Sequence, residues 1–511
     1  MIGLAQYIMP CLLGLSVSTS FIALILKAHR HYKWSSREEE LHRPHNVSIP
    51  RFGGIALAVA FISVVLLFRA VFGRSFFQEA ECWKVVTVSL AMFGLGLWDD
   101  FCSLGAKRKL AGQLLIASVA YFLGIAINKF QIPFLHQIID LGFWSWPVTV
   151  LWLVAMTNLI NLIDGIDGLA GGICLMLMLL MTYMGNGTGN VSFIATGMVG
   201  ALLGFLWFNF PPARIHMGDG GAYFLGFLIG NMTVVNSQKG PLLAALTAPL
   251  FVLALPILDT ALAILRRGAH GLPLFRADRG HIHHRLLETG LSYRKVVLGL
   301  YSFTAFFLLL GFTAFWFHGQ HLALLLGISV SVVLLAAGKF NFSREWFAVG
   351  RMLGTSLEAR SEIQYAICQS RWLALEGARS QSIESLCEDV VFIARKLGYA
   401  HIGIRLEDGE KVWQLAAINK EDCYCFQHKL PGHRYCFLEL NAPRSLLGEQ
   451  QATASRTTNE ATLKTTGDLL AEGWAKAIFA WKRQHQLPVR FDARRIKSPG
   501  DVSHLGNNQY L

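Results

Sequence analysis

Charge is scarce in this chain. Asp, Glu, Lys and Arg make up only 15% of its 511 residues, against 53% hydrophobic residues, and the mean hydropathy is +0.43. This balance excludes an ordinary soluble protein, and the apolar residues gather in runs of membrane-spanning length, which indicates a multi-pass membrane protein. The basic residues, which give a net charge of +12, lie in loops beside these runs and form no tract suited to nucleic acid. We therefore expect an anionic lipid or an anionic substrate as partner.

Other features are missing too. The nine cysteines are scattered, without the spacing of an extracellular disulfide framework, so we expect reduced thiols. The first apolar run, residues 2–26, lacks a basic n-region and a small-residue cleavage site, so it is interpreted as a retained helix and not as a signal peptide. No internal repeat or low-complexity tract is found.

The apolar runs predict about eleven transmembrane helices. The loop after the first run is basic, which places that loop in the cytoplasm and the N-terminus outside. Alternation from there puts the acidic and basic motifs described below on the cytoplasmic side. The predicted runs are 2–26, 53–72, 83–98, 110–127, 147–163, 168–184, 191–210, 220–235, 242–265, 295–317 and 320–338.

After Gly338 the composition becomes that of a soluble domain. The sequence predicts a helix over 382–397, a hairpin turning at Asp408-Gly409, a second hairpin turning at Pro431-Gly432, and a closing helix over 461–484. The predicted fold is therefore an all-α polytopic membrane protein with a small α/β cytoplasmic C-terminal domain. Its parts are a transmembrane domain (1–340), the α/β domain (345–485) and a loose tail (486–511).

Acidic residues occur where three apolar runs begin or end. Asp99 and Asp100 close one run, Asp164 and Asp167 follow another, and Asp219 opens a third. A carboxylate at the edge of a bilayer loses solvation energy unless a metal ion, a cation or water receives it, so several together indicate a shared purpose. Magnesium prefers such hard oxygen ligands and is commonly shared with substrate phosphates. We interpret these residues as one metal and phosphate site.

Polar residues recur at every third position around one of these segments, at Asn158, Asn161, Asp164 and Asp167. They lie along one slowly drifting helical stripe, which must face protein or water. Structural explanations stay open, because Asn and Asp also join membrane helices by hydrogen bonds, and a solvated helix end would account for an acidic pair alone. The glycines at 218, 220 and 221 would let a helix N-terminus approach a phosphate, although an ordinary Gly-rich loop has the same composition.

Basic residues form two further groups near the acidic motifs. The first is too cationic for a transition-metal site, so it favours binding of an anion, with anionic headgroups as the alternative; it contains Arg276, Arg279, His281, His283, His284 and Arg285. The second would hold a lipid phosphate, although positive-inside charge explains it equally well; it contains Arg51, Lys107, Arg108 and Lys109.

A zinc site is a weaker interpretation of the C-terminal part. The residues that suggest it alternate as a hairpin does, and their spacing matches no common zinc site. They are Cys423, Cys425, His428, His433 and Cys436.

Five motifs, in this order, resemble those of the polyprenyl-phosphate N-acetylhexosamine-1-phosphate transferases. The resemblance covers roughly residues 40–295, and its motifs are specific in combination: Pro50-Arg51-Phe52-Gly53-Gly54, Asp99-Asp100, residues 161–170, Gly218-Asp219 and residues 278–287. It implies ten or eleven membrane helices, a requirement for Mg²⁺ with Mn²⁺ as a substitute, and transfer of a sugar-1-phosphate from a UDP-sugar to undecaprenyl phosphate with release of UMP.

The resemblance also implies roles for the individual residues. Asn161 and Asp219 are similar to the magnesium site, and Asp99 and Asp100 to the pair that orients or deprotonates the lipid phosphate. Asp164 and Asp167 line the same cleft, and which aspartate acts as the base stays open. The expected substrate-binding residues are Arg51, Lys107, Lys109 and Asn158, together with His281, His283, His284 and Arg285 for the nucleotide diphosphate.

Within the family, one branch transfers phospho-N-acetylmuramoyl-pentapeptide and carries three consecutive histidines. This chain has His-Ile-His-His-Arg at 281–285 and resembles the branch that uses UDP-N-acetylglucosamine, while another UDP-N-acetylhexosamine or UDP-MurNAc-pentapeptide stays open. The expected partners are undecaprenyl phosphate, the UDP-N-acetylhexosamine and the lipid bilayer. A homodimer is left open, and no nucleic acid is expected.

The expected location is the inner (plasma) membrane, with the site and the C-terminus in the cytoplasm. A transporter is the rival from another class, but it predicts acidic residues near mid-span and inverted repeats, whereas these acidic residues lie at helix ends. The order helix, hairpin, hairpin, helix in the C-terminal part resembles a GAF-like sensor fold, with a plain structural appendage as the alternative.

Overall fold

The computed structural model describes residues 2–32, 49–78, 82–102, 104–131, 137–185, 190–239, 242–269, 286, 291–318, 321–339, 361–406, 409–415, 423–429, 437–443 and 460–485. The chain divides into two compact units, the first within residues 1–345 and the second mainly within 346–511. Each unit has its own buried core.

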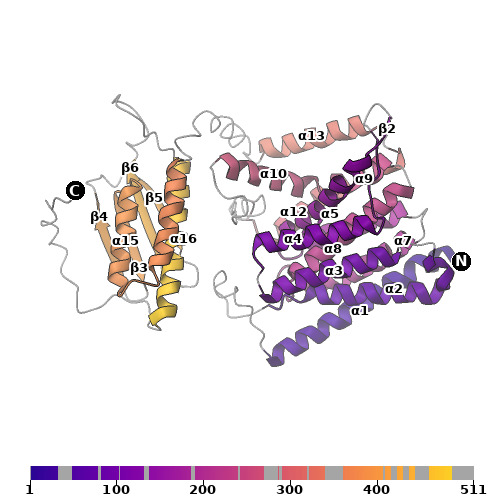
Figure 1. Ribbon diagram of the computed structural model, residues 1–511, viewed down its shortest axis with the longest axis horizontal. Helices are drawn as coiled ribbons and strands as arrows, with labels where there is room; N and C mark the ends of the chain where they lie inside the picture. Colours follow the sequence, from indigo (N-terminus) through magenta and orange to yellow (C-terminus); the bar gives the residue numbers. More distant parts are fainter. Residues whose placement is uncertain are drawn as a thin grey trace. The chain divides into compact units, whose positions relative to one another are not determined.

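The first unit is a bundle of helices (Figure 1). It contains α1 (Ile2–Tyr32), α2 (Gly53–Gln78), α3 (Cys82–Cys102), α4 (Ala106–Phe122), α5 (Ser145–Ile163), α6 (Leu169–Met184), α7 (Asn190–Asn209), α8 (Gly218–Lys239), α9 (Leu242–Val252), α10 (Ala254–Ala269), α12 (Tyr293–Trp316) and α13 (Leu322–Lys339). A short antiparallel pair, β1 (Lys129–Gln131) and β2 (Ile138–Asp140), and the 3-10 turn η2 (Gly142–Trp144) precede α5.

Among the residues that the structure describes, six stretches of this unit are long and apolar enough to cross a membrane: Tyr7–Arg30, Gly53–Val71, Trp83–Cys102, Gly142–Ile163, Val191–Asn209 and Tyr293–Trp316. A polytopic, mostly helical membrane protein is thus confirmed in its main lines, and the total of eleven spans stays a prediction. One predicted span, 242–265, is divided between α9 and α10. Pro256 explains the break, because proline lacks an amide hydrogen and its ring clashes with the carbonyl four residues earlier.

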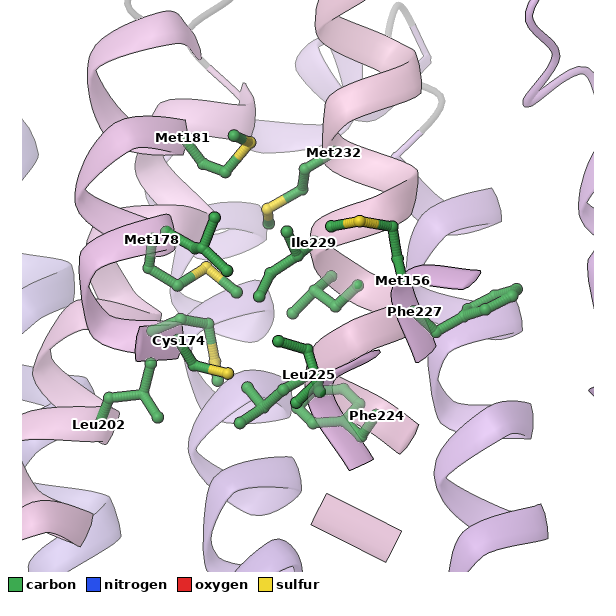
Figure 2. Packing of buried hydrophobic residues seen from close by; sticks show 14 of the residues in the cluster. Met156, Cys174, Met178, Met181, Leu202, Phe224, Leu225, Phe227, Ile229 and Met232 are labelled. Atoms are coloured by element: carbon green, nitrogen blue, oxygen red, sulfur yellow. The ribbon is translucent and has the colours of Figure 1, made fainter. Parts of the chain in front are cut away.

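The helix α8 lies at the centre of the bundle and packs against α2, α3, α5, α6 and α9. It approaches α5 closely at Gly226, where a Cβ atom would lie 2.7 Å from the carbonyl oxygen of Met156. Figure 2 shows the side chains of Met178 and Met181 on α6 facing Met232 on α8. Methionine is flexible and fills irregular gaps, which suits a core formed between helices that cross at different angles.

The second unit combines a four-stranded antiparallel sheet with helices. The strands are β3 (His401–Leu406), β4 (Gly409–Gln414), β5 (Cys423–Lys429) and β6 (Phe437–Pro443), in the order β4-β3-β6-β5. The helices are residues 361–376, α15 (Ile383–Lys396) and α16 (Glu460–His485). The predicted helices and the two predicted hairpins are present at these positions. The GAF-like assignment stays a prediction.

Local signals explain where α15 begins and ends. The side chain of Ser382 accepts a hydrogen bond of 3.1 Å from the amide of Ser385, which caps the N-terminus. Glu384 in the first turn and Arg395 and Lys396 in the last turn complement the helix dipole. Gly398 has a φ of +87°, a left-handed conformation that stops the helix.

Alternation along β3 and β6 builds the core of the second unit. The side chains of Ile402 and Ile404 on β3 and of Leu438 and Leu440 on β6 are fully buried. They lie on one face of the sheet and belong to the same core cluster as residues of α15 and α16, which cover that face (Figure 1). Trp474 of α16 fills the centre of this core.

Candidate functional site

Four helix ends of the first unit carry the acidic motifs. The acidic pair lies at the end of α3, Lys109 lies in the first turn of α4, Asn161 lies in the last turn of α5, and Asp219 lies in the first turn of α8. These elements are neighbours in the bundle, because α3 packs against α4 and α8, and α5 packs against α4 and α8. The fold thus brings together residues that are far apart in the sequence.

Asp219 is the centre of the cluster. Its Oδ2 atom lies 3.2 Å from the Nζ atom of Lys109, and its Oδ1 atom accepts a hydrogen bond of 3.0 Å from Nδ2 of Asn161. Lys109 also forms an ion pair with Oδ2 of Asp99. One ammonium group therefore joins two carboxylates from different helices.

The two partners of Lys109 differ in their exposure. The side chain of Asp99 is 2% exposed, whereas that of Asp219 is 34% exposed. Asp99 is held further by the amide of Leu104, which donates a 2.6 Å hydrogen bond to Oδ1. Asp99 is thus a fixed, enclosed charge, and Asp219 is the carboxylate of this pair that a ligand can reach.

Asp100 caps the N-terminus of α8 from another helix. Its Oδ1 accepts a hydrogen bond of 2.8 Å from the amide of Asp219, and its Oδ2 accepts one of 2.9 Å from the amide of Gly220. Free amides and the helix dipole favour an anion at this position. Gly218 has a φ of +77°, and a Cβ atom there would lie 2.9 Å from Oδ2 of Asp100, so glycine is required for this approach.

Asp167 joins the loop between α5 and α6 to the loop before α8. Its Oδ2 accepts a hydrogen bond of 3.1 Å from the amide of Ala213, and its Oδ1 lies 3.7 Å from Nδ1 of His216. The backbone of His216 and Met217 in turn bonds to residues 50–54. The amide of His216 donates to the carbonyl of Pro50, and the carbonyls of His216 and Met217 accept the amides of Gly53 and Gly54. The Pro-Arg-Phe-Gly-Gly motif therefore reaches the same place.

Asp164 follows the last residue of α5 and lies near the other carboxylates. Burial raises its pKa well above its usual range, and the charges of Asp219 and Asp100 act in the same direction, while the charge of Arg51 opposes them. Burial and neighbouring carboxylates both disfavour the charged form of a carboxyl group. Asp164 and Arg51 therefore lie close to the cluster that contains Asp219 and Asp100.

Other predicted residues lie away from this cluster or outside the description. Asn158 donates a hydrogen bond of 2.7 Å to Oε1 of Gln113 and so joins α5 to α4. Lys107 is exposed in the first turn of α4. The basic loop, with His281, His283, His284 and Arg285, lies outside the residues that the structure describes.

Three residues that support the site were not predicted from the sequence. Asn209 at the end of α7 accepts the amide of Gly168 on Oδ1 (2.9 Å) and donates to the carbonyl of Ile215 (2.7 Å). Tyr301 of α12 donates a hydrogen bond of 2.5 Å to the carbonyl of Gly168, and Arg294 donates one of 2.9 Å to the carbonyl of Pro211. These bonds fix the loop that carries Asp167 and the loop that leads into α8, where Asp219 lies. A polar residue at the end of an apolar run was the available signal for Asn209.

The donor set is suited to magnesium. Among the described residues, no three His, Cys, Asp or Glu side chains surround one point that could hold a metal. Mg²⁺ needs fewer protein ligands, because one or two carboxylates usually hold it together with water and substrate phosphates. Asp219 supplies a hard carboxylate donor that a ligand can reach, and the side chain of Asn161 lies beside it, with Nδ2 3.0 Å from Oδ1 of Asp219. The residues therefore fit Mg²⁺ that is shared with a diphosphate.

Comparison with known proteins gives consistent matches. Residues 82–237 match the family model described as Glycosyl transferase family 4. The chain is 34% identical over 259 residues to the probable undecaprenyl-phosphate N-acetylglucosaminyl 1-phosphate transferase of Bacillus subtilis (strain 168), an alignment that covers 50% of this chain and 71% of that protein.

Two further relatives cover similar shares. The chain is 31% identical to the decaprenyl-phosphate N-acetylglucosaminephosphotransferase of Mycolicibacterium smegmatis, across 58% of this chain and 79% of that protein. It is 27% identical to the phospho-N-acetylmuramoyl-pentapeptide-transferase of Chloroherpeton thalassium, across 51% of this chain and 79% of that protein. The matched model spans α3 to α8, which carry the acidic cluster.

Proposed function

The chain belongs to glycosyl transferase family 4, a family of membrane transferases that act on polyprenyl phosphates, and we propose that it transfers N-acetylglucosamine-1-phosphate from UDP-N-acetylglucosamine to undecaprenyl phosphate. UMP leaves, and the lipid product starts the assembly of a cell-envelope polysaccharide. The reaction takes place at the cytoplasmic face of the plasma membrane, where the water-soluble UDP-sugar meets a lipid that stays in the bilayer.

The observation that carries this proposal is the meeting of Asp99, Lys109 and Asp219 at the N-terminus of α8. Two anions, a lipid phosphate and a sugar diphosphate, must approach one another in such a reaction. Carboxylates that hold a divalent cation, together with a lysine, offset that repulsion and stabilise the charge of the transition state. If the polar residues of this site only joined helices by hydrogen bonds, an ammonium group between two carboxylates would not be needed.

In the proposed reaction, an oxygen of undecaprenyl phosphate attacks the phosphorus that carries the sugar. A new P–O bond forms, the bond from that phosphorus to the bridging oxygen breaks, and UMP leaves with this oxygen and its electron pair. Asp219, with Asn161 beside it, would hold Mg²⁺, which would supply charge neutralisation at the diphosphate. Mn²⁺ would substitute through the same oxygen donors.

The remaining residues have positioning and binding roles. Both carboxylate oxygens of Asp100 accept backbone amides, so it fixes the N-terminus of α8. Lys109 pairs with both Asp99 and Asp219 and, being partly exposed, can turn toward a substrate phosphate. Arg51, Lys107 and Asn158 are proposed to contact the lipid phosphate side. The basic loop, with His281, His283, His284 and Arg285, is proposed to bind the nucleotide diphosphate.

The choice of sugar rests on two observations. The basic loop lacks three consecutive histidines, and the 34% and 31% identical relatives are named for N-acetylglucosamine, whereas the muramoyl-pentapeptide transferase is 27% identical. Competition by unlabelled UDP-N-acetylgalactosamine and UDP-MurNAc-pentapeptide would test it directly.

A transfer assay in membranes tests the whole proposal. Radiolabelled UDP-N-acetylglucosamine and undecaprenyl phosphate should yield label in the organic phase, and EDTA should abolish this until Mg²⁺ is restored. Lys109→Met should reduce the transfer at least about tenfold, whereas Lys129→Met, at an exposed lysine of β1 outside the cluster, should leave it near wild type. Label that accumulates unchanged inside sealed vesicles, or equal losses in both variants, would contradict the proposal.

A further inference from the structure

The helix of residues 361–376 in the second unit has two apolar faces. One face is buried against the core of this unit and contains Ile363, Ala366, Ile367 and Leu373. The opposite face is exposed: Tyr365 is 42% exposed, Trp372 42% and Leu375 69%, and Cys368 is exposed as well. Large apolar side chains gathered on one stripe of a water-facing helix indicate a contact with another surface.

Packing against α16 fixes which way this helix faces. A Cβ atom at Gly473 of α16 would lie 2.6 Å from Oγ of Ser370, and Gly377 lies directly against Ala477. Ser370 and Gly377 are seven residues apart, so they lie on one side of the helix. The stripe of Tyr365, Cys368, Trp372 and Leu375 lies about 180° away from them at 100° per residue.

The spacing along the exposed stripe is three, four and three residues. This is the period of 3.5 that brings two helices together in a left-handed coiled coil, with Tyr365 and Trp372 in a positions and Cys368 and Leu375 in d positions. The apolar face of any amphipathic helix shows this spacing. The residues that flank the stripe therefore decide which partner fits it.

The residues beside the stripe favour a second copy of the same helix in parallel orientation. In that arrangement a g residue faces the e residue five positions later on the partner. Arg371 then faces Glu376 of the second copy, and Gln364 faces Gln369, on both sides of the pair. An antiparallel pair would instead bring Arg371 against Arg371, which is repulsive.

The surroundings of Glu376 strengthen this complementarity. Burial, and the nearby carboxylates of Glu376 and Glu388, raise the pKa of Asp389 on α15. The Glu376 end of the stripe therefore lies in an acidic patch, which suits the guanidinium group of a partner Arg371. Two heptads are short for an isolated coiled coil, but this helix is already formed on α16, so association need not supply the energy for folding it.

We propose that residues 361–376 form a parallel two-helix contact with the same residues of a second copy of this chain. The contact joins two transferases through their second units. It is independent of the proposed reaction, since none of its residues belongs to the acidic cluster.

Cross-linking of the full-length protein in its membrane tests the contact. Cys368 meets its own copy at a d position, so mild oxidation with copper phenanthroline should give a disulfide-linked dimer that is absent in Cys368→Ser. No dimer specific to Cys368 under these conditions would overturn the proposal.

Charge reversal tests the parallel register. Arg371→Glu should lower the cross-linked fraction about fivefold, because two attractive pairs become repulsive, and Arg371→Glu combined with Glu376→Arg should restore it. Leu375→Glu should lower it more than about tenfold. Val412→Glu is the matched control, because Val412 is 55% exposed on the face of the sheet away from the helices and should have no effect. An unrestored double variant, or unchanged cross-linking in Leu375→Glu, would show that the stripe receives something else, such as the bilayer surface.

Discussion

The two units of this chain differ in where they place their apolar side chains, as expected for a membrane domain and a water-exposed domain. The first unit turns large apolar side chains outward, such as Trp207, which is 77% exposed, and Leu151, which is 70% exposed. The second unit buries its apolar residues, such as Leu386 and Val390 of α15, and leaves charged residues outside. In the first unit a polar side chain is therefore the exception that needs an explanation. In the second unit the exception is an exposed apolar stripe.

Polar residues in the first unit are of two kinds. Deep in the bundle they are neutral and bond to a neighbouring helix or their own turn, as Asn231 does with Oγ of Ser89 (3.3 Å) and Thr233 with the carbonyl of Ile229 (2.7 Å). Such bonds join helices. The charged residues of the acidic cluster instead lie at helix ends and bond to one another, as Lys109 does with Asp219. This contrast supports the proposal that the reaction takes place at these helix ends.

The largest effect is expected from Asp219→Asn. This change removes one negative oxygen from the proposed metal site and the partner of Lys109, with almost no change of volume. Transfer should fall more than about a hundredfold, because the charge stabilises the transition state. The assay is sugar-phosphate transfer at saturating Mg²⁺, with circular dichroism and thermal unfolding in detergent as controls of folding. Near-normal transfer by this variant would show that the metal site does not include Asp219 of α8.

Asp100→Asn should have the next largest effect, chiefly on turnover. An asparagine has one acceptor oxygen for the amides of Asp219 and Gly220, so one of these two bonds is lost and the start of α8 shifts. We expect kcat to fall about tenfold to a hundredfold with KM little changed, and the unfolding free energy to fall by about 1 kcal/mol. Asp99→Asn should also reduce turnover severely. An unchanged kcat in Asp100→Asn would contradict the capping role.

Much of this fold follows from local sequence patterns, and the site does not. Apolar runs and helical or alternating periods predicted the helices of the first unit and both hairpins of the second. The pairing of Lys109 with Asp219 joins residues 110 positions apart, so no local pattern contains it. Asn209 and Tyr301 were missed for the same reason, because they support backbone groups of distant loops. The break between α9 and α10 depends on Pro256. The apolar composition of residues 242–265 predicted one continuous span instead.

A smaller effect is expected from Arg285→Ala in the basic loop. If the loop binds the nucleotide diphosphate, loss of one charge-assisted hydrogen bond costs about 1.5 to 3 kcal/mol, which corresponds to a rise of roughly tenfold or more in the KM for the UDP-sugar. The KM for undecaprenyl phosphate should stay near that of the wild type. Steady-state kinetics with each substrate varied in turn would decide, and a change confined to the lipid KM would assign the loop to the lipid.

The smallest effect on chemistry is expected from removing the second unit altogether. The proposed catalytic groups all precede Lys295, and the second unit has its own core of residues from α15, the sheet and α16. A chain truncated after Phe340 should therefore fold and transfer sugar phosphate in vitro within about twofold of the full chain, as expected for a separable domain. Truncated protein that reaches the membrane in normal amount with its helices intact, yet transfers nothing, would mean that the second unit takes part in catalysis and that the division of roles between the two units is wrong.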